Sequence, residues 1–521
     1  MQIMVGSITW TALRRAPMAG FALALALAGG GCAFRTASDL NAALTAAKTN
    51  HVALEQVIRH YETLGDTQKL AAARFLIGNM AGHAQVIFAL YDTNKQELPF
   101  DALAYPNLGE AQAKLDALEK QHGPVDFQPK QSIPDLETVK ADYLIENIDL
   151  AFLAWRTKPW AKGLTQQAFF EHILAYRSGR EPLDSWRPAC LQRYGWVPAK
   201  MKNPADLQEA ANLVMGDVNG WIGFNDLYYV HPNDQSFSEM AASRRGRCGD
   251  IANMTGYALR ANAIPSAADY TPFWADRDNN HAWTVILNEK GEGRAGLFHR
   301  AAKVYRKTYS HQPGNLAFEL APGEQAPRWL SGKAYADVTT QYMDATDVTV
   351  ELTNEVPPGV RFAFLCVFNG GEWQAIHWGR IEGRKVTFAS MGRNICYLPA
   401  YYVHEKLIPA GSPLIVEKNG QIQTLKGGGE AREKAQLSAT APALTSPDTH
   451  VVTPVAQLNQ GKKYELFVWK NGWQSLAKVE AAETTSKLDQ VSEGQLYWMV
   501  EEGSHKLERI FTVRDGQQVW W

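Results

Sequence analysis

Residues 244–265 read RRGRCGDIANMTGYALRANAIP, and residues 276–287 read DRDNNHAWTVIL. Apolar residues recur at spacings of three and four in the first stretch, which predicts a helix. Gly246 marks a turn before this helix, so Cys248 falls at its start. In the second stretch His281 opens a run of alternating residues that predicts a strand. The sequence thus places a cysteine at a helix start and a histidine at the start of a following strand.

The surroundings of Cys248 favour a reactive thiolate. A helix N-terminus carries a partial positive charge, and nearby cations also favour thiolate over thiol. Arg244, Arg245 and Arg247 can supply such cations. A cysteine nucleophile usually works with an imidazole within hydrogen-bond reach, and His281 is the candidate. We therefore expect Cys248 and His281 to form a catalytic pair.

Each of these residues also has a structural interpretation. A lone cysteine beside glycine is most often a small buried residue, so the pair is informative only through its order and framework. Asp250 is expected to cap the first helical turn rather than transfer protons. Trp274 and Trp283 fit either a substrate groove or the protein core.

The loop before His281 contains several metal-type ligands without a metal-binding spacing. Asp276, Asp278, Asn279 and Asn280 lack the glycine and terminal glutamate of an EF-hand loop. We therefore predict neither a metal site nor a cofactor.

The order of the motifs resembles the transglutaminase-like superfamily over about residues 135–310. The matching elements are Gly246-x-Cys248, Leu259-Arg260-Ala261-x-x-Ile264-Pro265 and His281-Ala282-Trp283. This resemblance implies a papain-like core, made of a helix and an antiparallel sheet. It also implies that Cys248 attacks an acyl carbonyl to form a thioester, while His281 assists and protonates the departing amine.

The third member of the family's triad is not identified in this sequence. The resemblance implies an aspartate on the strand after the histidine, yet the predicted return strand, residues 294–300, contains no carboxylate there. Asn288, Glu289 and Glu292 lie near the turn at Gly291, and His299 or a more distant residue could substitute. The third role therefore stays unassigned, which bears on catalytic competence more than on fold.

The N-terminus carries an export signal. Arg14 and Arg15 precede an apolar run of 13 residues, 16–28, too short to span a bilayer permanently. The small residues before Cys32 resemble a bacterial lipoprotein signal, in which residues 1–31 are removed and Cys32 is lipidated. An ordinary secretory signal with an incidental cysteine is the alternative. The expected location is the bacterial envelope, at the outer membrane in a Gram-negative host.

Patterning along the chain predicts an α+β protein. Helical periodicity dominates from about residue 33 to 240, and alternating strands begin near 337. The predicted parts are a signal peptide (1–31), a helical region (32–134), a transglutaminase-like core (135–335), a β-sandwich-like module (336–426), a linker or long loop (427–449) and a C-terminal β-rich module (450–521). Hairpin turns are indicated at Asn369-Gly370, Asn419-Gly420 and Asn471-Gly472.

Composition excludes several other classes of protein. The 521 residues include 52 Lys and Arg against 54 Asp and Glu, which argues against a nucleic-acid binder. With 20% charged and 45% hydrophobic residues, the chain is an ordinary globular protein. Beyond Cys32 and Cys248, the remaining cysteines, Cys190, Cys366 and Cys396, are either buried thiols or include a Cys366–Cys396 disulfide.

Two functions follow from the sequence. The first is an envelope cysteine enzyme that acts on a peptide or amide bond of a peptide, protein or glycopeptide, with hydrolysis favoured over acyl transfer because no amine-acceptor pocket is indicated. The second is a catalytically inactive scaffold lipoprotein that holds a glycan, peptide or protein partner. In both, the lipid anchor supplies the contact with the membrane.

Overall fold

The computed structural model describes residues 39–297, 299–427, 433–437, 439–440, 444, 456–481, 486–503 and 508–521. The predicted signal peptide and Cys32 lie outside these residues, as does most of the predicted linker 427–449. Within that linker, Glu433–Leu437 and Ala439–Thr440 form strands β18 and β19. Among the helices in the described ranges, none is long and apolar enough to cross a membrane.

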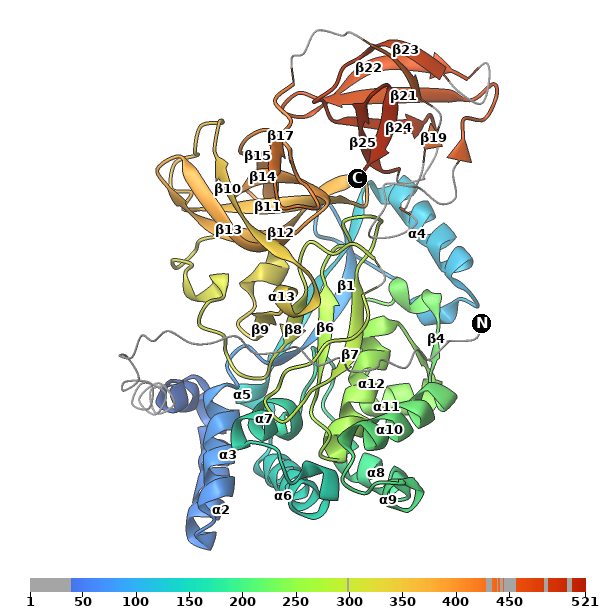
Figure 1. Ribbon diagram of the computed structural model, residues 1–521. Helices are drawn as coiled ribbons and strands as arrows, with labels where there is room; N and C mark the ends of the chain where they lie inside the picture. The colour runs from blue at the N-terminus through green and yellow to red at the C-terminus, as the bar shows by residue number, and fades with distance from the viewer. Residues whose placement is uncertain are drawn as a thin grey trace, which may run out of the picture.

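The fold is α+β, as predicted. Figure 1 shows most helices gathered at one end of the molecule and the β-rich modules at the other. The four-stranded sheet that contains β6 and β7 lies between them. The candidate catalytic residues belong to this middle region.

The first helices pack together through apolar faces. They are α2 (His51–Leu64), α3 (Thr67–Gly78) and α6 (Ala141–Thr157). Leu54, Val57 and Tyr61 on α2 are fully buried, as the helical spacing of their apolar side chains requires. Helix α3 begins where the Asp66 carboxylate accepts a hydrogen bond from the Lys69 backbone N–H at 3.0 Å.

The prediction of a helical region over residues 32–134 is incomplete. A three-stranded antiparallel sheet of order β2-β1-β3 lies within it, formed by β1 (Ala84–Asp92), β2 (Glu97–Leu98) and β3 (Val125–Pro134), and α4 (Leu108–His122) separates β2 from β3. Strand β1 reads AQVIFALYD, a nearly continuous apolar run, and such a run does not distinguish a strand from a buried helix by periodicity.

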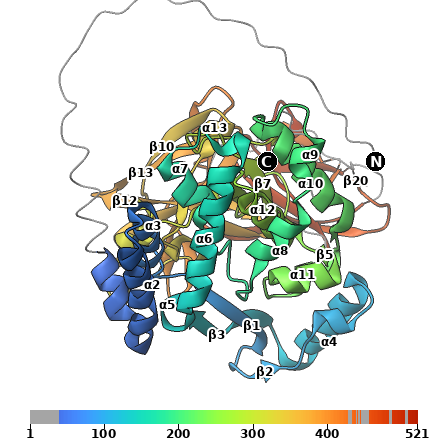
Figure 2. The same cartoon turned by 90° about the horizontal axis from the view of Figure 1, so that it is seen from below.

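Helix α12 (Cys248–Ala261) is the centre of the core domain. It contacts α6, α8 (Trp186–Arg193) and α10 (Leu207–Trp221), and Figure 2 shows these helices around it. Other short helices of the core are α5 (Asp135–Thr138), α7 (Gln166–Phe169), α9 (Val197–Lys200), α11 (Phe237–Ser243) and α13 (Thr339–Tyr342). Single 3-10 or π turns lie at Lys48–Asn50, Ala102–Ala104, Pro159–Ala161, Phe170–Leu174, Asp226–Tyr229, Leu316–Phe318 and Arg328–Ser331.

An antiparallel sheet of order β7-β6-β8-β9 packs against α12. Its strands are β6 (Ser266–Thr271), β7 (His281–Ile286), β8 (Tyr305–Lys307) and β9 (Tyr335–Asp337). A short parallel pair, β4 (Gly223–Phe224) and β5 (Arg245–Gly246), precedes α12. Strand β7 begins at His281 as predicted. The prediction of a return strand over residues 294–300 is wrong: its described residues form no strand, and β7 pairs with β6 instead.

The first β module is an eight-stranded antiparallel sheet of order β10-β13-β12-β11-β14-β16-β17, with β15 paired to β14. Its strands are β10 (Ala345–Glu351), β11 (Phe362–Asn369), β12 (Glu372–Glu382), β13 (Lys385–Gly392), β14 (Ile395–Val403), β15 (Lys406–Pro409), β16 (Leu414–Val416) and β17 (Ile422–Thr424). The predicted hairpin turns at Asn369-Gly370 and Asn419-Gly420 join β11 to β12 and β16 to β17.

The C-terminal module contains a five-stranded sheet of order β22-β21-β24-β25-β26. Its strands are β21 (Lys463–Trp469), β22 (Trp473–Glu480), β24 (Tyr497–Glu501), β25 (Ile510–Arg514) and β26 (Gln517–Trp520). Two further pairs join β18 to β23 (Ser486–Val491) and β19 to β20 (Ala456–Gln457). The predicted Asn471-Gly472 turn connects β21 to β22.

The cysteines of the described residues are all free. Cys190, Cys366 and Cys396 are buried thiols, which resolves the alternatives left open by the sequence against a Cys366–Cys396 disulfide. Burial raises the pKa of Cys190 to about 12. These three residues therefore act as small apolar side chains in the packing.

Buried histidines make the stability of the protein sensitive to acid. Burial lowers the pKa of His83 to about 4 and of His172 to about 3, and it lowers the pKa of His377 well below its ordinary value. Between these values and pH 6.5 the unfolded chain binds more protons than the folded one, so stability falls as pH falls. We expect a loss of about 2 kcal/mol per histidine between pH 7 and pH 5.

Urea unfolding at pH 7 and pH 5 measures this effect. A His83→Gln variant should show a smaller difference between the two pH values, whereas His404→Gln, at an exposed position, should keep the wild-type difference. Equal stability of the wild type at both pH values would contradict the assignment of neutral buried histidines.

Candidate functional site

Cys248 is the first residue of α12, and its side chain is half-buried. The first turn of α12 is capped by a residue of the same helix. The Asp250 carboxylate accepts hydrogen bonds from the backbone N–H groups of Arg247 at 3.1 Å and Gln235 at 3.3 Å. The expected capping role of Asp250 is therefore confirmed. This arrangement fixes the backbone that carries the thiol.

Gly246 makes the tight turn before Cys248 possible. A Cβ atom at this position would lie 2.7 Å from the Asp250 Cβ and 2.9 Å from the Met240 Sδ. Real Cβ atoms do not approach other atoms so closely, so no larger residue fits without displacing the capping carboxylate. The backbone at Gly246 also pairs with Phe224 in the parallel β4–β5 pair.

The three arginines before the thiol have different environments. The Arg247 guanidinium pairs with the Asp234 carboxylate, with 2.6 Å between Nη2 and Oδ1, and donates to the His231 carbonyl. Arg244 and Arg245 are exposed, and neither forms an ion pair with the described residues. The pKa of Arg247 is raised by Asp234 and Asp250 and also by Cys248, so this guanidinium is a positive charge near the thiol, together with the helix terminus.

The strand that carries His281 packs on the helix that carries Cys248. Strand β7 pairs with β6, where Thr271 lies opposite His281, and the Thr284 hydroxyl lies 3.4 Å from the Ala252 carbonyl of α12. The fold therefore brings the helix start and the strand start to the same region. Considering only described residues, no hydrogen bond joins the Cys248 Sγ to the His281 ring.

The His281 ring lies in an aromatic cluster. It stacks with Trp274 at 6.0 Å and with Trp283 at 5.5 Å between ring centroids. Trp274 is buried and Trp283 is half-buried, with its indole N–H donating to the Tyr342 hydroxyl at 3.0 Å. The two tryptophans thus pack with the candidate base. Burial, and then the neighbouring His299, lower the pKa of His281.

The carboxylates in this part of the core form hydrogen bonds and ion pairs with groups other than His281. Asp269 on β6 lies opposite Trp283 and is fully buried. Its carboxylate forms a two-point ion pair with Arg306 at 2.8 and 2.9 Å and accepts a hydrogen bond from the Tyr342 hydroxyl. The Glu292 carboxylate accepts from the Asn288 side chain within the turn. No described carboxylate is hydrogen-bonded to His281, and the third role remains unassigned.

His299, which the sequence analysis named as a possible substitute for the third member, lies close to this site. Its ring meets Trp274 edge-on at 5.3 Å, and its Nδ1 is buried without a hydrogen-bond partner in the described structure. Burial lowers the pKa of His299, so its imidazole is neutral at neutral pH. A neutral imidazole nitrogen can accept a hydrogen bond, which is the capacity that an orienting partner of His281 needs.

The loop before His281 is held by the β module. The Asn369 amide donates to the carbonyls of Trp274, Arg277 and Asn279 at 2.9 to 3.0 Å. The Gly370 backbone N–H donates to the Asp278 carboxylate at 2.7 Å. The Asn369-Gly370 turn therefore fixes the segment that leads into β7 and His281.

Arg509 from the C-terminal module reaches the same loop. Its guanidinium donates to the carbonyls of Ala275 at 2.7 Å, Phe368 at 2.8 Å and Trp521 at 3.0 Å, and it is buried. Three parts of the chain thus meet at one side chain. Helical and strand periodicity carried no signal of this contact, because Ala275 and Arg509 are 234 positions apart.

The acidic residues of the loop act as structural acceptors. The Asp276 carboxylate accepts from the Arg300 backbone N–H at 3.0 Å, and Asp278 accepts from Gly370. Where the structure describes the chain, no three His, Cys, Asp or Glu side chains group as metal ligands.

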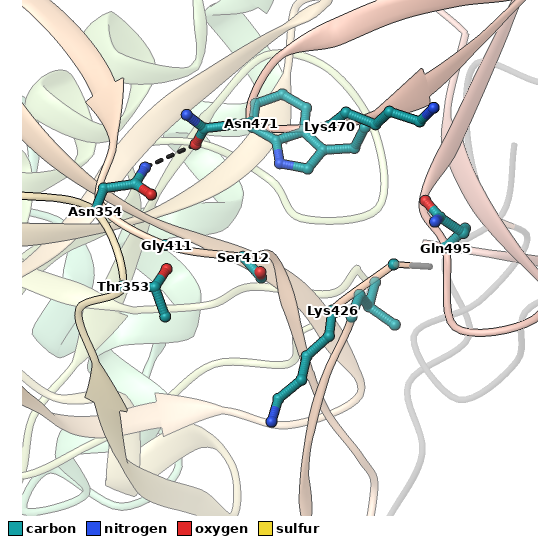
Figure 3. A pocket seen from close by; sticks show the side chains of 11 residues that line it. Thr353, Asn354, Gly411, Ser412, Lys426, Lys470, Asn471 and Gln495 are labelled. Atoms are coloured by element: carbon teal, nitrogen blue, oxygen red, sulfur yellow. Dashed lines mark hydrogen bonds between the residues drawn. The ribbon is translucent and has the colours of Figure 1, made fainter. Parts of the chain in front are cut away.

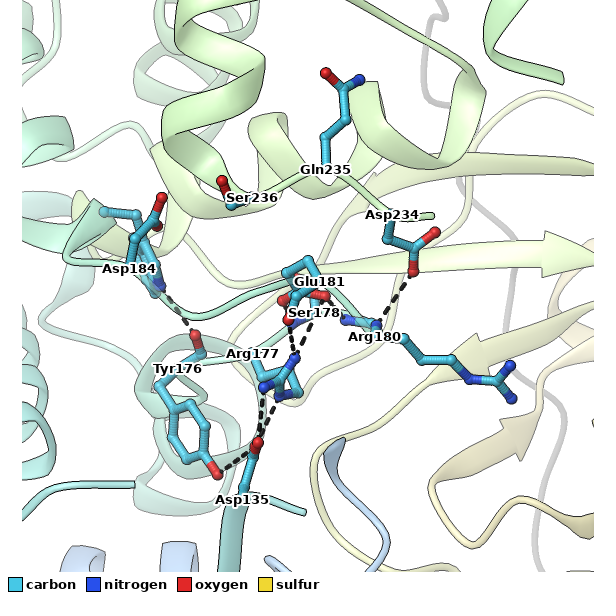
Figure 4. Close-up of polar contacts among 12 residues, drawn as sticks. Asp135, Tyr176, Arg177, Ser178, Arg180, Glu181, Asp184, Asp234, Gln235 and Ser236 are labelled. Atoms are coloured by element: carbon cyan, nitrogen blue, oxygen red, sulfur yellow. Dashed lines mark hydrogen bonds and ion pairs between the residues drawn. The ribbon is translucent and has the colours of Figure 1, made fainter. Parts of the chain in front are cut away.

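A buried ionic network anchors α12 at its middle (Figure 4). Arg177 forms a two-point ion pair with Asp135, with both distances 2.7 Å, and the Tyr176 hydroxyl donates to the same carboxylate at 2.9 Å. Glu181 accepts from the Tyr257 hydroxyl of α12 at 2.5 Å. The network fixes the position of α12, which begins with Cys248, against segment 176–181.

Two exposed aromatic rings beside Cys248 escaped the sequence analysis. Phe224 and Tyr229 are 55% and 46% exposed, and their rings meet at 5.7 Å. Burial, and then the nearby Cys248, raise the pKa of the Tyr229 hydroxyl. Exposed rings next to a thiol are suited to contact a substrate. In the sequence they are two of the four aromatic residues between positions 221 and 229, and no pattern distinguishes them from the other two.

Residues 197–292 match the family model of the transglutaminase-like superfamily. This segment contains Cys248 and His281, and its similarity is to the core domain of that superfamily. Among solved structures, red sea bream transglutaminase is similar with 10% sequence identity and a TM-score of 0.20, over 86% of this chain and 78% of that chain. No curated protein matches the sequence.

Proposed function

We propose that this protein is a cysteine enzyme that cleaves a peptide or amide bond through a thioester. The observation that supports it is the packing of β7, which begins with His281, on the helix that begins with half-buried Cys248. The domain family provides a framework in which such a pair performs acyl chemistry. Placement in the bacterial envelope, through lipidation of Cys32, belongs to the same proposal.

In the proposed reaction His281 takes the proton of the Cys248 thiol, and the sulfur attacks the carbonyl carbon of the substrate. The C–N bond then breaks, and the amine leaves with a proton delivered by His281. Water next attacks the thioester while His281 takes its proton, and the products are a carboxylic acid and the free thiol. Because the pKa of His281 is lowered, its imidazole is a neutral base at neutral pH.

The proposal also covers the choice between hydrolysis and acyl transfer and the residue that orients His281. Hydrolysis is favoured over acyl transfer because nothing identifies a pocket for an amine acceptor. His299 takes the orienting position in this proposal, with its unpartnered Nδ1 as acceptor for a His281 N–H. A neutral acceptor stabilises the imidazolium less than a carboxylate does, so a slow enzyme is expected.

The second candidate is a scaffold lipoprotein without catalysis. It is favoured by the lack of a hydrogen bond between the Cys248 Sγ and His281 in the described structure. A partner of such a scaffold would be a glycan, peptide or protein.

Thiol alkylation separates the two functions. We expect iodoacetamide to label Cys248 of the native protein faster than the same cysteine in denatured protein, and His281→Ala to remove that difference. Buried Cys190 is the internal control, which should stay unlabelled in the native protein. Peptide and glycopeptide libraries should then give products with wild type and none with Cys248→Ala. Equal labelling in both states, or products that persist in Cys248→Ala, would defeat the mechanism.

A further inference from the structure

Two cavities adjoin where the core and the β modules meet. The larger has a volume of about 880 Å³ and the smaller about 490 Å³, and Trp469 and Asn471 line both. Figure 3 shows the smaller cavity between the two β modules, where the Asn354 amide donates to the Asn471 side chain at 2.7 Å. Together the cavities form one extended groove, which we call the inter-module groove.

The larger cavity is lined by aromatic rings. These are Phe273, Trp329, Trp373, Tyr402, Trp469 and Trp473. Trp469 meets Trp373 at 5.7 Å and Trp473 at 5.1 Å, both edge to face. The indole N–H groups of Trp373 and Trp469 are buried without hydrogen-bond partners in the described structure. Buried donors are costly to leave unpaired, so a side-chain movement that brings these N–H groups to an acceptor of a ligand would be favourable.

The two β modules contribute matching parts of this wall. Residues 368–373 and 469–473 both run from an aromatic residue through an Asn-Gly turn to a tryptophan. Both turns place that tryptophan, Trp373 or Trp473, in the larger cavity. The repeated pattern is thus a means of presenting two indoles from two modules to one space.

Positive charge surrounds the groove. Arg180, Arg328 and Lys406 line the larger cavity, and Lys426 and Lys470 line the smaller. Within the described residues none of the five forms an ion pair, and Figure 4 shows the Arg180 side chain extending away from the buried network. Only Glu372 and Glu405 oppose them in the lining. Unpaired guanidinium groups are suited to bind carboxylates.

The backbone beside the groove is only partly paired. Strand β12 pairs with β13 only at Ile381 and Glu382, so the lining residues 372–375 have β11 as their one strand neighbour. An extended peptide is therefore an alternative occupant, and the binding test separates it from an oligosaccharide. The aromatic rings and unpaired cations of the lining favour the oligosaccharide.

We propose that the inter-module groove binds an oligosaccharide that carries carboxylate groups. The C–H faces of its sugar rings stack on the aromatic wall, and its hydroxyl groups pair with the unpartnered indole N–H groups and with Thr353, Asn354, Ser412 and Gln495. Arg180 and Arg328 bind its carboxylates. This binding goes beyond the proposed enzyme function and does not depend on Cys248.

The test uses the full chain on an array of oligosaccharides that contains uronic acids and their neutral counterparts. We expect uronic-acid oligosaccharides to bind, measured by calorimetry for the best array member, with affinity that falls as salt rises. An Arg180→Gln/Arg328→Gln variant should bind about 10-fold or more weakly, since both side chains are exposed and the fold is retained. Trp373→Ala should bind still more weakly.

Matched variants control each change. Arg59→Gln on α2 and Trp378→Ala, five residues along β12 and outside the groove lining, should bind as wild type. Cys248→Ala should also bind as wild type, so that failure of the enzyme proposal leaves this result intact. Binding to no oligosaccharide, preference for the neutral counterparts, or binding of peptides alone would overturn the proposal.

Discussion

An Arg177→Met variant is expected to lose about 3–5 kcal/mol of its free energy of unfolding at neutral pH. Arg177 is the cation between two buried carboxylates, Asp135 and Glu181, whose side chains are each 1% exposed. Methionine keeps much of the side-chain volume but leaves both acids without a positive partner. Removal of one member of a buried ionic group is costly because the remaining charge is desolvated and uncompensated.

The same variant should respond to acid in a characteristic way. The deficit should shrink from pH 7 to pH 5 as the unpaired carboxylates become able to take up protons, and urea unfolding of variant and wild type measures it. Adding Asp135→Asn and Glu181→Gln to Arg177→Met should restore part of the lost stability. Arg180→Met, three residues away and exposed, is the matched control, with a change expected within about 0.5 kcal/mol. A deficit that does not change with pH would show that lost packing, not charge, is responsible.

Arg509→Met should cost about 3 kcal/mol or more and should also disturb the catalytic strand. The substitution leaves three backbone carbonyls without their donor and removes a cation 3.9 Å from the Asp278 carboxylate. Ala275 and Asp278 belong to the loop that ends at His281. We therefore expect the loop to loosen even at temperatures where the protein stays folded.

Thermal unfolding and Cys248 alkylation test this prediction together. The variant should unfold at a lower temperature, and its native Cys248 should react at a rate closer to that of the His281→Ala variant. Arg514→Met, at the end of β25 and five residues along the chain, is the control, since its ion pair with Glu417 is partly exposed and should be worth less than about 1 kcal/mol. If Arg509→Met changes stability but leaves the alkylation rate at the wild-type value, the loop does not depend on this contact.

The local features of the site could be predicted because they depend on neighbours in sequence. Cys248 at a helix start, Asp250 as its cap and His281 at a strand start all follow from spacing within a few residues. The hairpin turns at Asn369, Asn419 and Asn471 follow for the same reason. Short-range patterns encode local backbone geometry directly.

The remaining features depend on residues distant in sequence. Strand β1 was hidden by a continuous apolar run, and residues 294–300 were expected to pair as a strand that the sheet does not use. The contact of Asn369 with the loop joins positions more than 90 apart for two of its three bonds, and Arg509 reaches further still. Charge pattern and periodicity do not specify which distant partner a buried polar side chain finds.

The clamp on the His281 loop also sets an order of events during synthesis. A ribosome makes Cys248 and His281 long before Asn369, and Arg509 follows 234 positions after its partner Ala275. A nascent chain that already contains the candidate catalytic pair therefore lacks the side chains that hold the histidine's loop in place. The loop that leads into His281 should therefore reach its final structure only when the last module is complete.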